Sequence, residues 1–237
     1  MSRDIYPAMT GASAIWEQMN SISHNLSNVN TNGYKSIRVT FENHMAKAGY
    51  LGDSFVKLSE EEIDFSTGSI VQDGVDTHFA LNGDGFFVVE AEDGENLVMR
   101  AGSFQFNNQG ILVNPMGEPV LKSDGGYVQI DQENRAIQLD EEGRIFDQNG
   151  DEIGQLFIAD SDDLTPLTGG RWRAGELLPA SPKTRVIQGA LELSNTNPFR
   201  EMTEMIQTTR MFDSLQKAMQ SSNELDGKLN QMTRRSG

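Results

Sequence analysis

The sequence predicts an α+β protein with two terminal α-helices that form a coiled-coil-like axial domain, and a central all-β domain. Apolar residues recur at alternating intervals of three and four over residues 5–29, and a second helical stripe runs through residues 199–232. Between these two helical segments, turn signals that contain glycine separate short apolar stretches. This pattern is typical of a small antiparallel barrel or sandwich. Long helices at opposite ends of a chain indicate a protein that is built to assemble.

The first stripe has the spacing of a coiled-coil seam. Gly11 and the Ser and Asn run over residues 20–32 are poor helix formers, so burial against a partner helix must supply the stability. The partner can belong to the same chain, as in a helical hairpin that closes one globular domain, or to another chain, and the spacing leaves both open. The residues expected on this seam are Ile5, Ala8, Ala12, Ile15, Met19, Ile22, Leu26 and Val29.

The second stripe is less regular but stays on one face of a helix. Two helices with narrow apolar faces and weak intrinsic propensity are expected to stay mobile in the monomer and to become ordered when neighbouring subunits cover them. The residues expected on the second half of this assembly interface are Met202, Met205, Ile206, Thr209, Phe212, Leu215, Met219, Leu225 and Leu229.

The central segment reads as a series of antiparallel hairpins. Seven turn signals, from Asn82-Gly83-Asp84-Gly85 to Asn149-Gly150, alternate with short apolar stretches. The stretches expected as strands include residues 86–89, 111–113, 127–130 and 156–158. We expect an N-terminal axial helix with its exit turn at residues 1–35, a connector at 36–76, an acidic β-rich domain with its return linker at 77–185, and at 186–237 a C-terminal axial helix that packs with the first.

Charge is concentrated in the middle of the chain. The formal net charge is −16; residues 1–50 carry +1 and residues 183–237 carry +2, which leaves −19 between them. So acidic a segment repels nucleic acid and anionic lipid, and we expect neither nucleic-acid binding nor direct membrane insertion. The nearly neutral ends can approach copies of themselves without strong repulsion.

Composition excludes several classes of chemistry. The chain has no cysteine, so thiolate catalysis and disulfides are impossible. No apolar run approaches the roughly 18 residues that suggest a membrane span. The first residues lack the charged and apolar regions of a cleavable signal peptide, so we expect any export to use a different route.

No motif predicts a catalytic, metal or cofactor site. His24, His44 and His78 have no partner at the spacing that a metal site on a helix uses. Residues 147–158 resemble the start of a calcium loop but lack its glycine and its bidentate glutamate. Gly83-Asp84-Gly85 lacks the third glycine of a dinucleotide loop. The sequence therefore predicts no enzyme and no cofactor.

Residues 24–35, HNLSNVNTNGYK, form an unusual helix exit in which asparagines can cap the helix and Asn32-Gly33 can reverse the chain. This segment resembles the N-terminal signature of the bacterial flagellar rod and hook family, NLANVNT followed by glycine, an aromatic residue and a basic residue. Ser27 and His24 depart from that pattern. The matching residues are Asn25, Leu26, Asn28, Val29, Asn30, Thr31, Gly33, Tyr34 and Lys35.

Two further blocks resemble the same family in the expected order. Residues 79–121 are similar to its β-rich core, with an NGDGFF turn, although Val98-Met99-Arg100 stands where the family usually has Tyr-Thr-Arg. Residues 189–220 are similar to its C-terminal signature. Together the three blocks cover more than a third of the chain. The matching residues in these two blocks are Gly83, Gly85, Phe86, Phe87, Gly189, Leu191, Glu192, Ser194 and Asn195.

The resemblance implies a structural subunit of the flagellar rod, the shaft that passes torque from the motor to the hook. Residues 5–12 and the short connector are most similar to proximal-rod members; a distal-rod or hook-type axial paralogue is the alternative, and a β-domain binding module or a carboxylate hydrolase are alternatives from other classes. The implied partners are proximal and distal rod subunits, other copies of this chain and the flagellar type III export apparatus. The implied location is the basal body, spanning the periplasm.

Overall fold

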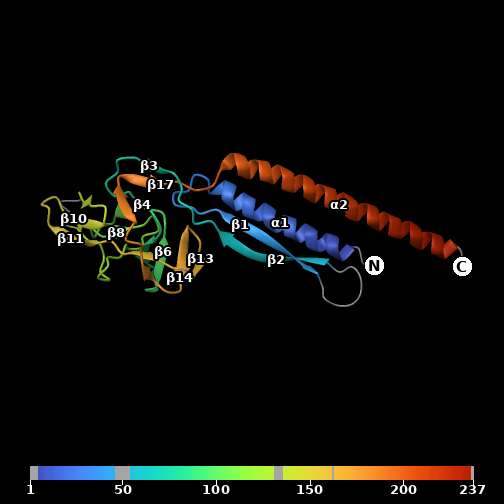
Figure 1. Ribbon diagram of the computed structural model, residues 1–237, viewed down its shortest axis with the longest axis horizontal. Coiled ribbons are helices and arrows are strands. Elements are labelled where there is room, and N and C mark those ends of the chain that lie inside the picture. The colour runs from blue at the N-terminus through green and yellow to red at the C-terminus, as the bar shows by residue number, and fades with distance from the viewer. Residues whose placement is uncertain (1–4, 46–53, 131–135, 162, 236–237) are drawn as a thin grey trace. The chain divides into compact units, whose positions relative to one another are not determined.

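The computed structural model describes residues 5–45, 54–130, 136–161 and 163–235 (Figure 1). The chain divides into two compact units, and its path enters each of them more than once. We call them the helical unit, which comprises residues 1–28, 36–64 and 196–237, and the β unit, which comprises residues 29–35 and 65–195.

The helical unit contains the two terminal helices and a β-hairpin. Helix α1 (Ile5–Ser27) packs against helix α2 (Pro198–Arg235) and against the antiparallel strands β1 (Ile37–Met45) and β2 (Ser54–Ile63). In Figure 1, α1 lies between α2 and the hairpin. The predicted pairing of the two terminal helices is confirmed, and it occurs within one chain.

Local sequence explains where α2 begins. Asn197 is the N-cap, because its Oδ1 accepts hydrogen bonds from the backbone N–H groups of Phe199 at 3.1 Å and Arg200 at 3.3 Å. Pro198 occupies the first helical position, where the missing N–H costs no hydrogen bond. The 38-residue helix therefore starts at a well-defined place.

The hairpin was not expected, since residues 36–76 were predicted to be a connector. Its start is fastened to α1: Asn25 Oδ1 accepts a hydrogen bond from Ile37 N, and Asn25 Nδ2 and Ser21 Oγ donate to Ile37 O, all at 2.8–2.9 Å. The segment therefore belongs to the helical unit up to Asp64, and only the residues after it belong to the β unit.

The β unit is built from short antiparallel strands. Six form one sheet in the order β13-β14-β6-β5-β12-β15, three form a second in the order β11-β10-β9, and the others pair as β16-β4, β17-β3 and β7-β8. The strands are β3 (Ile70–Gln72), β4 (Phe79–Asn82), β5 (Phe86–Glu90), β6 (Asn96–Met99), β7 (Gln105–Phe106), β8 (Leu112–Val113), β9 (Gln138–Leu139), β10 (Arg144–Phe146), β11 (Glu152–Gln155), β12 (Ile158–Asp160), β13 (Leu164–Pro166), β14 (Arg171–Ala174), β15 (Leu178–Pro179), β16 (Arg185–Gln188) and β17 (Ala190–Glu192).

All seven predicted turns are confirmed, because each contains a glycine with positive φ, from Gly83 at 123° to Gly150 at 86°. Residues 127–130, expected as a strand, make only isolated bridges. The expected return linker after Asp160 instead contains three strands of the large sheet. Trp172 on β14 holds this segment in place, since it is buried against Phe86 with ring centroids 5.5 Å apart.

The core of the β unit is aromatic and aliphatic. Phe87 is fully buried and meets Phe104 edge to face, with ring centroids 5.2 Å apart, and Phe79 also packs against Phe104, with ring centroids 5.8 Å apart. Leu81, Leu112 and other aliphatic side chains complete the same cluster. This core gives the β unit a hydrophobic centre of its own.

Candidate functional site

The predicted seam packs inside the helical unit. Ile15 and Ile22 of α1 are buried, and Leu215 of α2 comes so close to Gly11 that an added Cβ there would lie 3.9 Å from its Cδ1. Half-buried residues flank these contacts: Ala12, Met19 and Leu26 on α1, and Met205, Thr209, Phe212, Leu215 and Met219 on α2. The side chains of Ile5, Ala8 and Leu229 lie outside the part that the structure describes.

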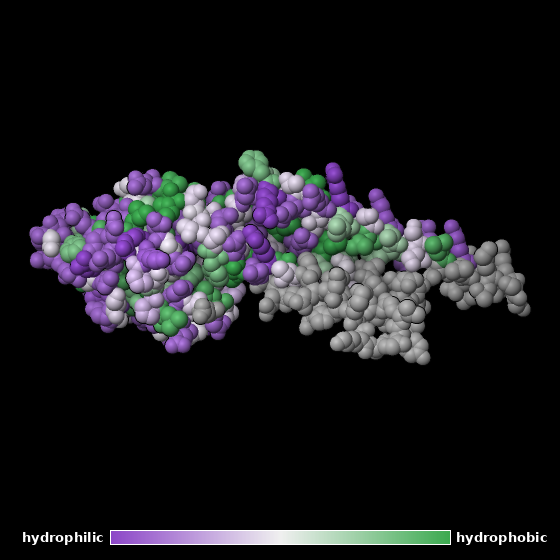
Figure 2. Space-filling model, in the orientation of Figure 1, coloured by the Kyte–Doolittle hydropathy of each residue, from purple (hydrophilic) through white to green (hydrophobic). Residues whose placement is uncertain are grey.

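Part of the apolar surface of α2 is not covered within the helical unit. Phe199, Met202 and Ile206 follow one another at intervals of three and four, and their exposed fractions are 76, 42 and 54%. Met9 and Trp16, seven residues apart on α1, are also more than half exposed. Figure 2 shows apolar surface along the two helices. We call Phe199, Met202 and Ile206 the outer stripe.

The single stripe predicted on α2 thus divides between two faces. Met205 and Phe212 face the helical unit, whereas Met202 and Ile206 face away from it. Leu225, also predicted for the interface, is 60% exposed, as is Met211 at 59%, which was not predicted. Exposed large apolar side chains at helical spacing are what a contact surface for another protein requires.

A buried carboxyl group lies where α2 meets α1. Glu201 is only 8% exposed, and its Oε2 accepts a hydrogen bond from Asn25 Nδ2 at 3.3 Å. Burial raises the pKa of Glu201, and nearby Glu204 adds to the rise, whereas the Asn25 hydrogen bond, Arg200 and Arg38 of β1 lower it. The folded helical unit therefore favours the protonated form of Glu201.

Glu201→Gln is expected to stabilise the helical unit at pH 7 and to change nothing at acid pH. The pKa of Glu201 is higher in the folded helical unit than its unfolded value of 4.5. The stability that protonated Glu201 contributes is therefore fully present below pH 4.5 and is lost as the pH rises through the folded pKa. Thermal melts of the helical circular dichroism at pH 4 and pH 7 measure this. Glu204→Gln is the matched control, since the partly exposed Glu204 carboxylate pairs with Arg200 at 2.8 Å. An equal rise of Tm in both variants at pH 7 would contradict the argument that burial of Glu201 costs stability.

In the β unit, four of the residues that carry the family resemblance take part in one buried ion cluster: Lys35, Gly83, Gly85 and Glu192. Glu192 Oε1 accepts a hydrogen bond from Lys35 Nζ at 2.8 Å, and Glu192 Oε2 accepts one from Arg100 Nε at 2.5 Å. The Arg100 guanidinium also donates to the carbonyl groups of Gly83 and Gly85. Arg100 was not predicted as a site residue; its only signal was the Val-Met-Arg segment at the place of the family's Tyr-Thr-Arg.

Some of the remaining resemblance residues make hydrogen bonds beside this cluster or at the helix exit. Gly33 N–H donates to Glu192 O at 2.8 Å, and Asn195 N–H donates to Tyr34 O at 3.4 Å. Asn28 Nδ2 donates to His24 O at 2.9 Å and so caps α1. Phe86 and Phe87 are buried, Val29, Leu191, Gly189 and Ser194 are half-buried, and Asn30 and Thr31 are exposed.

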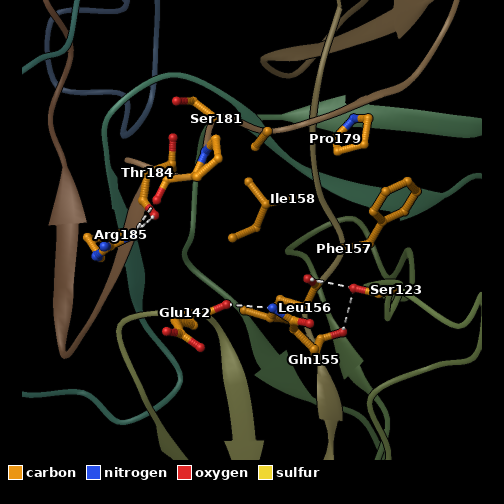
Figure 3. A pocket seen from close by; sticks show the side chains of 12 residues that line it. Ser123, Glu142, Gln155, Leu156, Phe157, Ile158, Pro179, Ser181, Thr184 and Arg185 are labelled. Carbon is orange, nitrogen blue, oxygen red and sulfur yellow. Dashed lines mark hydrogen bonds between the residues drawn. The ribbon is translucent and has the colours of Figure 1, made fainter.

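A groove of about 530 Å³ lies in the β unit (Figure 3). Its polar side chains already bond within the unit: Ser123 Oγ donates to Leu156 O at 3.2 Å, Gln155 Nε2 to Glu142 O at 2.9 Å, and Thr184 Oγ1 to Asp84 O at 2.6 Å. Because these side chains are already bonded inside the unit, the groove does not favour a ligand-binding module.

The described residues form neither a metal site nor a membrane-spanning helix. Within the ranges that the structure describes, no three His, Asp or Glu side chains lie close enough together to hold a metal ion. None of the helices in those ranges combines the length and the apolar character needed to cross a membrane.

Comparison with known proteins identifies two matching family models. The one described as "Flagellar hook protein FlgE/F/G D1 domain" matches residues 80–150, and the one described as "Flagellar basal body rod FlgEFG protein C-terminal" matches residues 187–232. The first covers the hydrophobic centre of the β unit, and the second covers β17 and most of α2.

Curated relatives match along nearly the whole chain. The flagellar basal-body rod protein FlgF of Caulobacter vibrioides is 29% identical over 235 residues, with 95% of each chain covered. FlgF of Rhizobium meliloti is 29% identical over 230 residues, with 94% of each covered. FlgG of Buchnera aphidicola subsp. Acyrthosiphon pisum is 30% identical over 265 residues, covering 98% of this chain and 100% of the relative.

Proposed function

Because the chain belongs to the flagellar basal-body rod FlgE/F/G family, we propose that it is a proximal-rod subunit of the FlgF kind. The family is one of structural rod proteins, and the chain is a structural protein rather than an enzyme. As a rod protein it assembles with other rod subunits in the flagellar basal body.

Alignment length supports the proximal assignment over the distal one. The matches to FlgF of Caulobacter and Rhizobium extend over 235 and 230 positions, close to the 237 residues of this chain. The matches to FlgG of Bacillus subtilis and Buchnera extend over 256 and 265 positions, so those relatives carry insertions that this chain lacks. FlgF of Salmonella typhimurium aligns over 253 positions, so FlgF relatives also differ in the insertions they carry.

The observation that carries the proposed role in assembly is the outer stripe. Covering Phe199, Met202 and Ile206 would contribute roughly 1.5 kcal/mol for each side chain, or about 4–5 kcal/mol for one contact. Association costs about 4–15 kcal/mol in lost translational and rotational freedom, so a single contact is too weak. A subunit that contacts several neighbours at once, as in a helical shaft, gains enough free energy to offset this cost. The helical unit would therefore become fully stable only in the assembled shaft.

The distribution of charge agrees with contacts between helical units. The helical unit holds 10 basic and 13 acidic residues, a formal charge of −3, whereas the β unit holds 9 and 22, a formal charge of −13. Helical units can therefore approach one another closely, and β units repel. We take proximal and distal rod subunits and further copies of this chain as the partners, with delivery to the periplasm by the flagellar type III export apparatus.

The test is the position of the chain in purified basal bodies. In cells whose only copy carries an affinity tag in the β unit, electron microscopy with a labelled antibody is expected to place the tag on the rod near the motor, and deletion of the gene should abolish the rod and swimming. Label near the hook would favour the distal alternative, and basal bodies without label would contradict a role in the rod.

A further inference from the structure

The ion cluster in the β unit is unbalanced. Two cations, Lys35 and Arg100, share the single carboxylate of Glu192, which also accepts a hydrogen bond from Gly68 N at 2.8 Å. The three ionic side chains are only 1–4% exposed. Since buried charges are tolerated only when they are paired and hydrogen-bonded, both cations depend on Glu192.

Each cation also fastens a different part of the backbone. Arg100 donates to the carbonyl groups of Leu81, Gly83 and Gly85, which closes the turn between β4 and β5. Lys35 Nζ donates to Ser66 O at 2.8 Å, which joins the first segment of the β unit, residues 29–35, to the start of its second segment. Loss of the counter-ion would therefore disturb two places that are far apart in the sequence.

The cluster joins residues that are far apart in the sequence, so it can form only after most of the β unit is present. Lys35 and Glu192 are 157 residues apart, and Arg100 and Glu192 are 92 apart. The last strands of the unit close on its first: β17 pairs with β3, and β16 pairs with β4. A chain that lacks the segment around Glu192 leaves Lys35 and Arg100 without this carboxylate and strands β3 and β4 without β17 and β16.

We infer that Glu192 is a folding lock: the β unit becomes stable only when the segments around residues 35, 100 and 192 are all in place, so a partly delivered chain stays open. The lock follows from the contacts alone and does not depend on a role in the rod. On the export route proposed above, it would keep the chain unfolded until almost all of the β unit has passed through the channel.

A charge-balance series in the full-length chain tests the lock. Trp16→Phe leaves Trp172, 5% exposed on β14, as the only tryptophan, so its fluorescence reports unfolding of the β unit. Glu192→Gln removes the carboxylate that the two buried cations share and is expected to lower Tm by about 10–20 °C. Lys35→Met leaves the balanced Arg100–Glu192 pair in place and should lower Tm by less than Glu192→Gln does.

The double variant Lys35→Met/Glu192→Gln has the same excess charge as the natural cluster and is expected to melt above Glu192→Gln alone. Glu95→Gln is the matched control, because it breaks the exposed ion pair with Arg173 and should shift Tm by only about 2 °C or less. Hydrogen exchange in Glu192→Gln should show joint loss of protection in β4, β5 and residues 29–35.

A double variant that melts at or below Glu192→Gln would overturn the lock, because a role in packing alone predicts additive damage. Loss of protection confined to residues near 192 would overturn it as well. If Glu192→Gln does not fold at all, a folded double variant supports the lock, whereas a double variant that fails while Lys35→Met folds contradicts it.

Discussion

A chain with aspartate in place of Ile206 is expected to fold normally and yet fail to join the rod. Ile206 is 54% exposed in the isolated chain, so the new carboxylate stays in water and the helical unit loses little stability. In the assembled shaft the same carboxylate would be buried in an apolar contact, at a cost of several kcal/mol for each subunit. Incorporation should fall by about 100-fold or more, and swimming should stop.

The measurement pairs circular dichroism of the purified chain with the amount of chain in isolated basal bodies. Ser214→Asp is the matched control, since it adds the same charge at an exposed position of α2 outside the outer stripe. Leu26→Asp and Phe212→Asp would be weaker tests, because both side chains are half-buried and their loss would disturb the fold itself. Normal swimming with Ile206→Asp would remove the outer stripe as an assembly contact.

Gly33→Ala is expected to destabilise the β unit by roughly 3–5 kcal/mol, a large part of the stability of an ordinary domain. Gly33 has a φ of 66°, and an added Cβ would lie 2.3 Å from Ala101 N and 2.7 Å from Ala101 Cα. These are backbone atoms that cannot move aside without breaking the neighbouring contacts with Arg100 and Glu192. Trp172 fluorescence during chemical denaturation measures the loss.

Gly74→Ala separates the effect of crowding from that of backbone strain. Gly74 has a similar φ of 74°, but nothing lies within 4 Å of an added Cβ. This variant should therefore cost only the conformational strain, about 1–2 kcal/mol. Equal losses in the two variants would show that close approach at Gly33 contributes nothing, and the tight packing of the helix exit against Ala101 would then be wrong.

Local patterns in the sequence predicted the elements that depend on neighbouring residues. The turn at Gly83 and Gly85 and the helix that carries Ile15 and Ile22 were predicted correctly, because glycine position and helical spacing are local signals. The hairpin at residues 37–63 was missed, since the acidic run Glu60-Glu61-Glu62 hides strand alternation and the hairpin is defined by its contacts with α1. Strand β14 was missed because Trp172 is fixed by distant aromatic residues.

The candidate site could be predicted only in part, for the same reason. Spacing showed that both helices need partners but could not say which residues would face the chain's own helix. Met202 and Met205 belong to one predicted stripe, and only the packing of α2 on α1 places the first outside and the second inside. Arg100 lacked any local signal strong enough to pair it with a glutamate 92 residues away.

The most direct test of the central claim, that neighbouring subunits cover the outer stripe, uses the absence of cysteine from the chain. A single Ile206→Cys substitution is labelled with a maleimide in the isolated subunit and in purified basal bodies, with Asp124→Cys in an exposed turn of the β unit as the control. We expect both cysteines to react in the isolated subunit and only the control to react in basal bodies. Equal labelling of Ile206→Cys in the two states would contradict the claim.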